Sequence, residues 1–427
     1  GSLCGRLLGW LRWGQPVAER QRYDVVIVGA GIAGSALAAA LLGQGIRVAL
    51  VEARPLEPAP LPRVLDLAQF DPRVSALTPL SIAFLDEIGA WDAIADYRNC
   101  PYGHMTVWDA DGTATIDFDA AEVDAGSLGT IVENRAITNA LLERLQHAGE
   151  TRLLAPASLA SCEAVAGDGV SLTLEDGAEL EADLLVAADG ALSRVRELMG
   201  FRTREWDYGH RAIVTTVALE HPHQDTAWQC FMPTGPLALL PLPSSEDTHY
   251  CSIVWSQQDE AAEALLALDD AAFCEALGRA SEFRLGRVLD TARRFAFPLR
   301  QRHAVDYVMP GVALVGDAAH TIHPLAGQGI NLGLADVAAL AGEIGAAADR
   351  GLAAGELSVL KRYQRQRKGE NLAMMAAMDG FKRLFEQRAP AIRWLRNAGL
   401  RGVGRLSPLK HQLMRQAMGL GAGDGAG

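Results

Sequence analysis

The glycines near the N-terminus have the spacing of a phosphate-binding turn. An apolar run, Val25 to Val28, leads into Gly29-Ala-Gly31-Ile-Ala-Gly34, and an alanine-rich stretch follows. In a strand–turn–helix unit of this kind, Gly29 permits the tight turn and Gly31 lets the backbone approach a pyrophosphate. Gly34 lets the helix pack closely on the strand. The unit therefore predicts a dinucleotide cofactor.

A carboxylate stands where such a cofactor presents its ribose. The run Ile46 to Val51 predicts a second strand, and Glu52 follows it directly. An acidic side chain about 20 residues after the glycines accepts hydrogen bonds from ribose hydroxyl groups. Glu52 thus favours an unphosphorylated adenosine ribose, as in FAD or NAD.

A second strand–turn–helix unit lies towards the C-terminal end. Val312 to Val315 predicts a buried strand, Gly316-Asp317 ends it, and a helix begins near Gly329 after a loop rich in glycine and proline. A helix start presents free backbone N–H groups to whatever lies above it. We therefore expect an anionic or electron-rich cofactor at this turn.

The loop and helix start of this second unit carry a long motif. From His323 to Asp336 the chain reads His-Pro-Leu-Ala-Gly-Gln-Gly-Ile-Asn-Leu-Gly-Leu-Ala-Asp. This run resembles, without a gap, the signature of the flavin-dependent aromatic hydroxylases of ubiquinone biosynthesis. The resemblance extends over roughly residues 23–420. It implies an α/β fold like that of para-hydroxybenzoate hydroxylase, with a Rossmann-type FAD domain, a β-sheet substrate domain and C-terminal helices.

Three further motifs of that family occur here in the family's order. They are Arg73-Val-Ser-Ala, Val132-Glu-Asn134, and Ala188-Asp189-Gly190 with the following x-x-Ser-x-Val-Arg. By resemblance, Arg73 and Asn134 lie beside the flavin, and Asp189-Gly190 lies near the pyrophosphate and riboflavin. The residues that we expect to bind the cofactor are Gly29, Gly31, Ile32, Ala33, Gly34, Glu52, Ala53, Arg54, Arg73, Asn134, Asp189, Gly190, Gly316, Asp317, Pro324, Gly327, Gly329, Ile330 and Asn331.

The reacting edge of the flavin is assigned by resemblance to the loop of Pro324, Gly327, Gln328 and Gly329. We expect no metal, and we assign no side chain as catalytic acid or base. His320 and His323 are candidates for that role, but a structural role at a helix start or loop is the favoured interpretation. The chemistry is then the cofactor's.

The elements that must position these residues divide the chain into three parts. Short β-rich runs over 201–300 predict an antiparallel sheet, residues 258–290 look helical, and two alternating stretches (103–118 and 170–190) predict hairpins. The expected FAD-binding domain comprises 21–103, 128–200 and 296–350. The expected substrate domain comprises 104–127 and 201–295, and a helical region spans 351–420.

Composition excludes several classes of protein. With 427 residues, 49% of them hydrophobic, the chain can build two packed domains. Its net charge of −13 argues against a nucleic-acid partner. The six cysteines show no Cys-x-x-Cys spacing, which argues against a zinc or redox motif and fits a reducing, cytoplasmic compartment.

Both ends of the chain are basic and apolar. Residues 3–14 place leucines and Trp10 at helical spacing, which is typical of an interfacial anchor or of a terminal extension. Residues 387–423 contain seven basic and no acidic residues, so the rest of the chain carries −20. A packed tail with a solvated basic face fits this pattern. So does a surface facing anionic lipid, which would place the protein peripherally at the inner membrane.

The resemblance implies an FAD-dependent monooxygenase. In that family the flavin is reduced by an external donor, NAD(P)H or a reductase or ferredoxin, and takes up dioxygen as a C4a-hydroperoxide. One oxygen atom then passes to the ring of a prenylated phenol or benzoquinol in ubiquinone synthesis. Cys251–Trp255, His320–Pro324 and Arg415–Leu420 look most like the branch acting at C5 of 2-polyprenylphenol. Action at C1 or C6 stays open. The expected partners are this substrate, dioxygen and other proteins of the pathway.

Two other functions fit the sequence less well than the monooxygenase. A flavin halogenase would carry Trp-x-Trp-x-Ile-Pro, and no Trp-x-Trp occurs in the chain. A non-catalytic protein, either a flavin-bound scaffold or a prenyl-lipid carrier, would not need every flavin motif to be intact. Both alternatives are therefore less favoured than ring hydroxylation.

Overall fold

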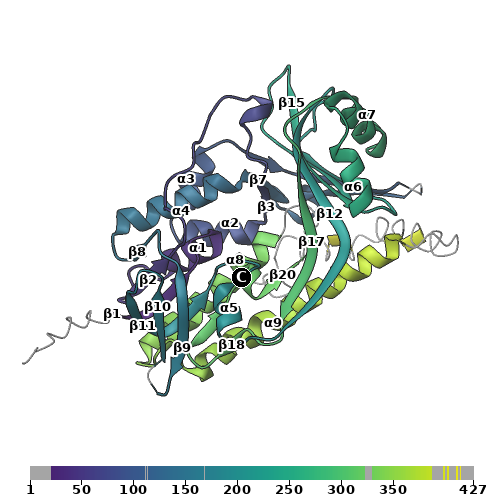
Figure 1. Ribbon diagram of the computed structural model, residues 1–427. Coiled ribbons are helices and arrows are strands. Elements are labelled where there is room, and N and C mark those ends of the chain that lie inside the picture. Colours follow the sequence, from purple (N-terminus) through teal and green to yellow (C-terminus); the bar gives the residue numbers. More distant parts are fainter. Residues whose placement is uncertain are drawn as a thin grey trace, which may run out of the picture.

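The computed structural model describes residues 21–110, 112, 114–167, 169–322, 329–386, 398–399, 402, 410–411 and 414. Within these residues the chain forms three sheets and the helices that pack against them (Figure 1). The mixed α/β architecture confirms the predicted fold class.

The first sheet has eight strands in the order β18-β19-β11-β1-β2-β8, with β10 and β9 continuing from β11. Strands β19, β11, β1, β2 and β8 run parallel. Consecutive residues Val25, Val26 and Ile27 of β1 are all fully buried, so both faces of the sheet are covered. The strands of this sheet are β1 (Gln21–Val28), β2 (Val48–Val51), β8 (Arg152–Leu154), β9 (Leu159–Val165), β10 (Gly169–Leu174), β11 (Glu179–Ala187), β18 (Val308–Met309) and β19 (Val312–Leu314).

Four long helices pack around this sheet: α1 (Ile32–Ala40), α4 (Asn134–Ala148), α8 (Gly329–Asp349) and α9 (Leu357–Glu386). Helix α8 lies between α1 and α9 (Figure 1). It has 21 residues, and an 18-residue stretch of it has a mean hydropathy of 1.3, so it is the one described helix long and apolar enough to cross a membrane. Its residues Leu334, Val337, Leu340 and Ile344 are buried in the core beside the sheet, as expected of a core helix.

A small three-stranded sheet stands beside the first, in the order β3-β7-β4. Its strands are β3 (Val74–Leu77), β4 (Asn99–Tyr102) and β7 (Gly129–Glu133). Helices α2 (Pro79–Glu87) and α3 (Trp91–Asp96) lie between β3 and β4 in the chain. Leu85 of α2 and Ile88, which caps its C-terminus, are buried, whereas Ile82 is half-buried.

The third sheet has nine strands in the order β20-β17-β12-β15-β14-β13-β5-β6, with β16 beside β12. Helices α6 (Asp259–Leu266) and α7 (Asp270–Ala280) pack on it through a core that contains Trp255 and Phe273. The strands are β5 (His104–Asp109), β6 (Thr115–Asp119), β12 (Thr203–Leu219), β13 (Thr226–Phe231), β14 (Leu237–Pro241), β15 (His249–Gln258), β16 (Val288–Thr291), β17 (Phe295–Ala304) and β20 (His320–Thr321).

Two features of this region differ from the sequence-based picture. The strands within 201–300 pair antiparallel, as predicted, but β5 of the preceding hairpin joins them through a parallel pair with β13. Residues 258–290 are not helical throughout, because the chain leaves α7 at Ala280 and Val288 begins β16. Strand β17 pairs with β12 as far as Ala304. The domain division, with its boundary at residue 296, stays a proposal.

Candidate functional site

The expected cofactor residues follow neighbouring strands at one edge of the first sheet. Gly316-Asp317 follows β19, Asp189-Gly190 follows β11, the glycine-rich turn follows β1, and Glu52 follows β2. Backbone hydrogen bonds tie these ends together, since the Gly29 N–H donates to Val51 (2.8 Å) and the Ala188 N–H to Val28 (2.8 Å). The carboxyl edge of a parallel sheet is where such folds bind ligands.

In the glycine-rich turn, two glycines are required for packing and one faces open space. Gly29 has a φ of +103°, and a Cβ there would lie 2.3 Å from the Ala188 carbonyl oxygen. A Cβ at Gly34 would lie 1.8 Å from the Gly29 carbonyl oxygen. A Cβ at Gly31 would meet nothing within 4 Å, and no described side chain caps α1. The N–H groups at the start of α1, at Ile32 and Ala33, therefore face space that a pyrophosphate fits.

The Glu52 carboxylate is fixed at the end of β2. It accepts hydrogen bonds from the Ala30 N–H (2.9 Å) and the Arg54 N–H (3.1 Å), one on each oxygen. Each oxygen keeps a lone pair for another donor. Ala53 and Arg54 are exposed. The group suits the hydroxyl donors of a ribose, which is the role expected from its place in the sequence.

Asp189 acts on its own backbone turn. Its carboxylate accepts from the Ser193 hydroxyl and from the N–H groups of Arg194 (2.7 Å) and Val195 (3.2 Å). These bonds hold the start of α5 (Arg194–Leu198). Gly190, at φ +81°, makes the turn between them. Asp189 thus shapes the loop, and its carboxylate is largely occupied by that task.

We call Gly29–Gly34, Asp189-Gly190 and Gly316-Asp317 the first, second and third motif turns. Arg196 links the second motif turn to the third. Its buried guanidinium donates to the Ala191 carbonyl (2.7 Å) and the Ala318 carbonyl (2.9 Å). The first carbonyl follows Asp189-Gly190, and the second follows Gly316-Asp317. The sequence motif that begins at Ala188 ends with this arginine, but the motif alone predicts no role for it. Its position in the motif is the one sequence feature that marks it.

Gly316 lies against the glycine-rich turn. Its φ is +58°, and a Cβ there would lie 3.4 Å from the Ala33 Cβ. Its N–H donates to the buried Asp336 carboxylate of α8 (3.1 Å). The neighbouring Asp317 side chain is exposed. The first and third motif turns, almost 300 residues apart in the sequence, therefore lie close together, with little room for a side chain at Gly316.

Two asparagines from different helix starts hold β3. The Asn134 N–H donates to the Arg73 carbonyl (3.0 Å), and its side-chain oxygen accepts from the Ser75 hydroxyl (2.6 Å). The Asn331 side chain accepts from the Thr78 N–H (3.0 Å) and donates to the Ala76 carbonyl (2.8 Å). Strand β3 is thereby attached to α4 and α8.

Arg73 stands at the boundary between two sheets. It is exposed, and its guanidinium lies 5.4 Å from the ring centroid of Phe297 on β17. At the start of α8, Ile330 is half-buried, and a Cβ at Gly329 would meet nothing within 4 Å.

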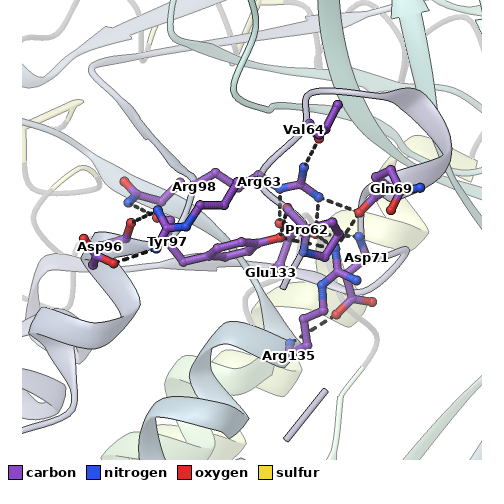
Figure 2. A network of polar contacts seen from close by, with 11 residues as sticks. Pro62, Arg63, Val64, Gln69, Asp71, Asp96, Tyr97, Arg98, Glu133 and Arg135 are labelled. Carbon is purple, nitrogen blue, oxygen red and sulfur yellow. Dashed lines mark hydrogen bonds and ion pairs between the residues drawn. The ribbon is translucent and has the colours of Figure 1, made fainter. Parts of the chain in front are cut away.

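A buried ionic network supports the segment around Arg73 (Figure 2). The Glu133 carboxylate is 2% exposed and accepts from Arg98 (2.8 Å), Arg135 (2.7 Å) and the Asp71 N–H (2.6 Å). Arg98 also donates to the carbonyls of Val64 and Gln69 and covers the Phe70 ring at 4.3 Å. The segment before β3 is therefore fastened to β7 and α4. Sequence reasoning noted Glu133 only as part of a motif.

His320 has a structural contact. Its Nε2 pairs with the buried carboxylate of Asp336. Burial alone would raise the pKa of Asp336, but the charges of His320 and Arg367 hold it below its usual value. On β12, the Tyr208 hydroxyl contacts Gln301 and Asp379 (3.3 Å).

Part of the predicted site lies outside the described residues, namely His323, Pro324, Gly327 and Gln328. The other predicted residues lie around the carboxyl edge, β3 and the start of α8. The open backbone at Gly31, the exposed α1 N-terminus and the carboxylate of Glu52 match the pyrophosphate and ribose of FAD.

A cluster elsewhere resembles a metal site without fitting one. Ligand atoms of Cys100, His223 and Asp225 lie within 4.8 Å of one another. The His223 Nδ1 accepts from the Asp225 N–H (3.1 Å), so its Nε2 donates to the Leu242 carbonyl (2.8 Å). Burial raises the pKa of the Cys100 thiol to about 12. Hydrogen bonding accounts for this group of side chains.

Sequence comparison agrees with the geometry. The model of a family described as "FAD binding domain" matches residues 22–377. A 3-demethoxyubiquinol 3-hydroxylase of Escherichia coli is 39% identical over 94% of this chain and 99% of its own. The mitochondrial ubiquinone biosynthesis monooxygenase COQ6 of Homo sapiens is 36% identical over 96% of this chain and 95% of its own.

Solved structures agree on the fold. PqsL of Pseudomonas aeruginosa, a probable FAD-dependent monooxygenase, superposes with a TM-score of 0.73 at 24% identity, covering 90% of this chain and 100% of its own. The p-nitrophenol 4-monooxygenase PnpA of Pseudomonas putida superposes with a TM-score of 0.74 at 20% identity, covering 94% and 99%.

Proposed function

Because the chain belongs to the FAD-dependent hydroxylase family of ubiquinone biosynthesis, we propose that it hydroxylates the aromatic ring of a polyprenylated phenol or benzoquinol. It is a flavin-dependent monooxygenase. The observation that carries the proposal is the meeting of three motif turns at the carboxyl edge of a parallel sheet, with the nine-stranded sheet beside them.

We assign the cofactor contacts by the geometry of each turn. The N–H groups at the start of α1 bind the pyrophosphate, because Gly31 leaves the backbone open to it. Glu52 accepts from the ribose. Asp189 and Arg196 shape the turn beside them, and Gly316 places the backbone of the third turn against α1.

The bound flavin supplies activated oxygen once an external donor has reduced it. The protein's part is to orient the substrate ring, to exclude water and to stabilise negative charge. The N–H groups at the start of α8, from Gly329, carry the positive end of a 21-residue helix dipole, which stabilises negative charge on a ligand nearby. Strands β12 and β17 supply a wall for the substrate, and Arg73 stands where that wall meets the cofactor site.

Two ring positions compete. The motifs Cys251–Trp255, His320–Pro324 and Arg415–Leu420 favour C5 of 2-polyprenylphenol, and we propose this position first. The 39% identity to a 3-demethoxyubiquinol 3-hydroxylase favours the later hydroxylation of an already substituted ring. Both reactions use the same cofactor site and differ in the ring that the substrate wall must accept.

The test is genetic. We expect deletion of the gene to abolish ubiquinone and to accumulate a polyprenylphenol lacking the C5 oxygen, identified by mass spectrometry of a lipid extract. An accumulated demethoxyubiquinol would move the assignment to the other position. Unchanged ubiquinone in the deletion strain, with no relative able to replace the gene, would contradict the function.

Complementation separates catalysis from a scaffold or lipid-carrier role. The wild type should restore ubiquinone, and Gly31→Val, which places a side chain where the pyrophosphate binds, should not. If Gly31→Val lost FAD but still restored ubiquinone, the chain would serve as a scaffold or carrier. The electron donor is identified by measuring which of NADH, NADPH or a reductase with ferredoxin reduces the bound flavin.

We also propose a peripheral position at the cytoplasmic face of the inner membrane, where a prenylated substrate resides. The basic residues of 387–423 are the candidates for lipid contact. One of them, Lys410, instead forms an ion pair with Glu122 (2.6 Å).

A further inference from the structure

A single buried carboxylate joins three segments of the chain: α8, α9 and the turn that contains Gly316 and His320. Asp336 of α8 is 0% exposed. It accepts hydrogen bonds from the Gly316 N–H (3.1 Å), from His320, from the Arg367 guanidinium (2.9 Å) and from the Asn371 amide (3.1 Å). A charge withdrawn from water is costly unless its lone pairs are satisfied, and here four donors satisfy them.

The donors are themselves held in place. Asn371 accepts from Arg367 (3.1 Å) and donates to the Tyr307 hydroxyl (3.2 Å). The Tyr307 hydroxyl also meets His303 of β17 (3.0 Å). Through these contacts the network extends from α8 and α9 to both the first and the third sheet. It has few alternative arrangements, because nearly every member is buried and bonded more than once.

Two of the four donors border the third motif turn. Gly316 precedes Asp317, and His320 lies three residues after it, at the start of β20. Asn331, five residues before Asp336 on the same helix, is bonded to β3. Asp336 thus fixes both ends of the turn that contacts α1, from a helix that is also tied to the Arg73 segment.

We infer that Asp336 is a positioning residue for the flavin site, which it serves by holding the Gly316 N–H and His320 in fixed places. This inference rests on the proposed assignment of the Gly316-Asp317 turn to the flavin. The carboxylate is fully buried and acts through the backbone of the turn. Its hydrogen bond with the Gly316 N–H fixes the turn close to Ala33 of α1. Without that charge, the turn would be less ordered and the flavin less tightly bound.

The test compares Asp336→Asn with two controls. Glu370→Gln changes another carboxylate that is bonded to Arg367. The Glu370 side chain is 71% exposed. Leu277→Ala creates a cavity in the core between α7 and the third sheet. It should lower the thermal stability without affecting the Gly316-Asp317 turn. For each purified holoenzyme we would measure the FAD dissociation constant, the visible circular dichroism of the bound flavin and the melting temperature.

We expect Asp336→Asn to weaken FAD binding about tenfold, since a charge-assisted hydrogen bond is lost, and to alter the flavin dichroism. Glu370→Gln should leave both unchanged. Leu277→Ala should lower the melting temperature and leave both flavin measurements unchanged. If Asp336→Asn kept the wild-type affinity and dichroism, or if Leu277→Ala changed them to the same extent, the positioning role would be refuted.

If Asp336→Asn does not fold, a second variant still tests the inference. The double variant Asp336→Asn with Arg367→Met removes both charges, a change that buried pairs often tolerate. It should fold and still bind FAD more weakly than the wild type, and wild-type binding would refute the role. Gly31→Val tests the site itself. If Gly31→Val retained FAD, the assigned site would be wrong, whereas loss of FAD in Gly31→Val with no effect in the Asp336 variants would refute only the inference.

Discussion

At the residue scale, neighbouring glycines of one turn have separate tasks. The space beyond Gly31 is open, whereas a Cβ at Gly34 would overlap the Gly29 carbonyl oxygen at 1.8 Å. We predict that Gly31→Val lowers FAD affinity at least about tenfold and changes apoprotein stability by less than about 0.5 kcal/mol. Gly34→Ala should instead destabilise the fold by about 3 kcal/mol.

Equilibrium FAD titration and denaturant unfolding of both variants check this pair. The division of tasks would be wrong if the two substitutions had the same effect on stability. It would also be wrong if Gly31→Val bound FAD as the wild type does.

His303 should make stability depend on pH. Burial, together with the charges of His320, Lys368 and Arg204, lowers its pKa from 6.5 to about 4. Between these two pH values the unfolded chain binds more protons than the folded one. The contribution of His303 to the free energy of unfolding is therefore fully present above about pH 6.5 and is lost as the pH falls towards 4. For this group alone we predict a loss of about 2 kcal/mol between pH 7 and pH 5.

The measurement is the free energy of unfolding of the wild type and His303→Gln at both pH values. The variant should lose less stability on acidification than the wild type. His147→Gln, at an exposed position on α4, is the matched control and should retain the wild-type slope. Parallel slopes for wild type and His303→Gln would contradict the assignment.

At the element scale, the segment before β3 depends on the carboxylate of Glu133. Glu133→Gln would leave the buried Arg98 guanidinium without a charged partner (Figure 2). We predict a loss of about 3 kcal/mol and faster hydrogen exchange over residues 62–73. Glu143→Gln, an exposed carboxylate on the adjoining helix α4, should cost less than about 0.5 kcal/mol. Wild-type exchange in Glu133→Gln would show that other contacts suffice.

The elements that sequence predicts well here are those with local signals. The Gly29–Gly34 turn, the strand before it and Glu52 all lie within 30 residues, and spacing alone indicates their geometry. The hairpin of β10 and β11 has its Asp176-Gly177 turn within the predicted range. The candidate site residues remain predictions in their cofactor contacts, although the described ones lie around the carboxyl edge of the first sheet, β3 and the start of α8.

The remaining features depend on contacts that sequence spacing does not indicate. Asp336 pairs with Arg367 across two helices, and the Tyr307 hydroxyl joins His303 to Asn371. Nothing local distinguishes Arg367 from the exposed basic residues around it on α9. The parallel pairing of β5 with β13 joins residues more than 100 positions apart, so alternation predicts the strands and not their neighbours. The partner of β17 is undetermined by the sequence for the same reason, since its apolar start does not indicate that it pairs with β12.

At the scale of the whole molecule, charge is unevenly distributed. Residues 387–423 carry +7 on a chain of −13. If this segment faces lipid, replacing Arg388, Arg393 and Arg396 by glutamate should abolish flotation with anionic vesicles, since each basic residue contributes about 1 kcal/mol. The matched control reverses three exposed arginines elsewhere, Arg63, Arg279 and Arg287. Equal flotation of both triple variants and the wild type would exclude the basic segment as the lipid contact.

The order of strands in the first sheet has a consequence for synthesis. Strand β19 completes the parallel edge by pairing with β11, and Asp336 fastens the turn that follows it. A nascent chain that ends before α8 therefore contains the third turn but lacks the carboxylate of Asp336 that fastens it. The site can mature only after residue 336 has left the ribosome, so chains that terminate before this residue should not bind FAD.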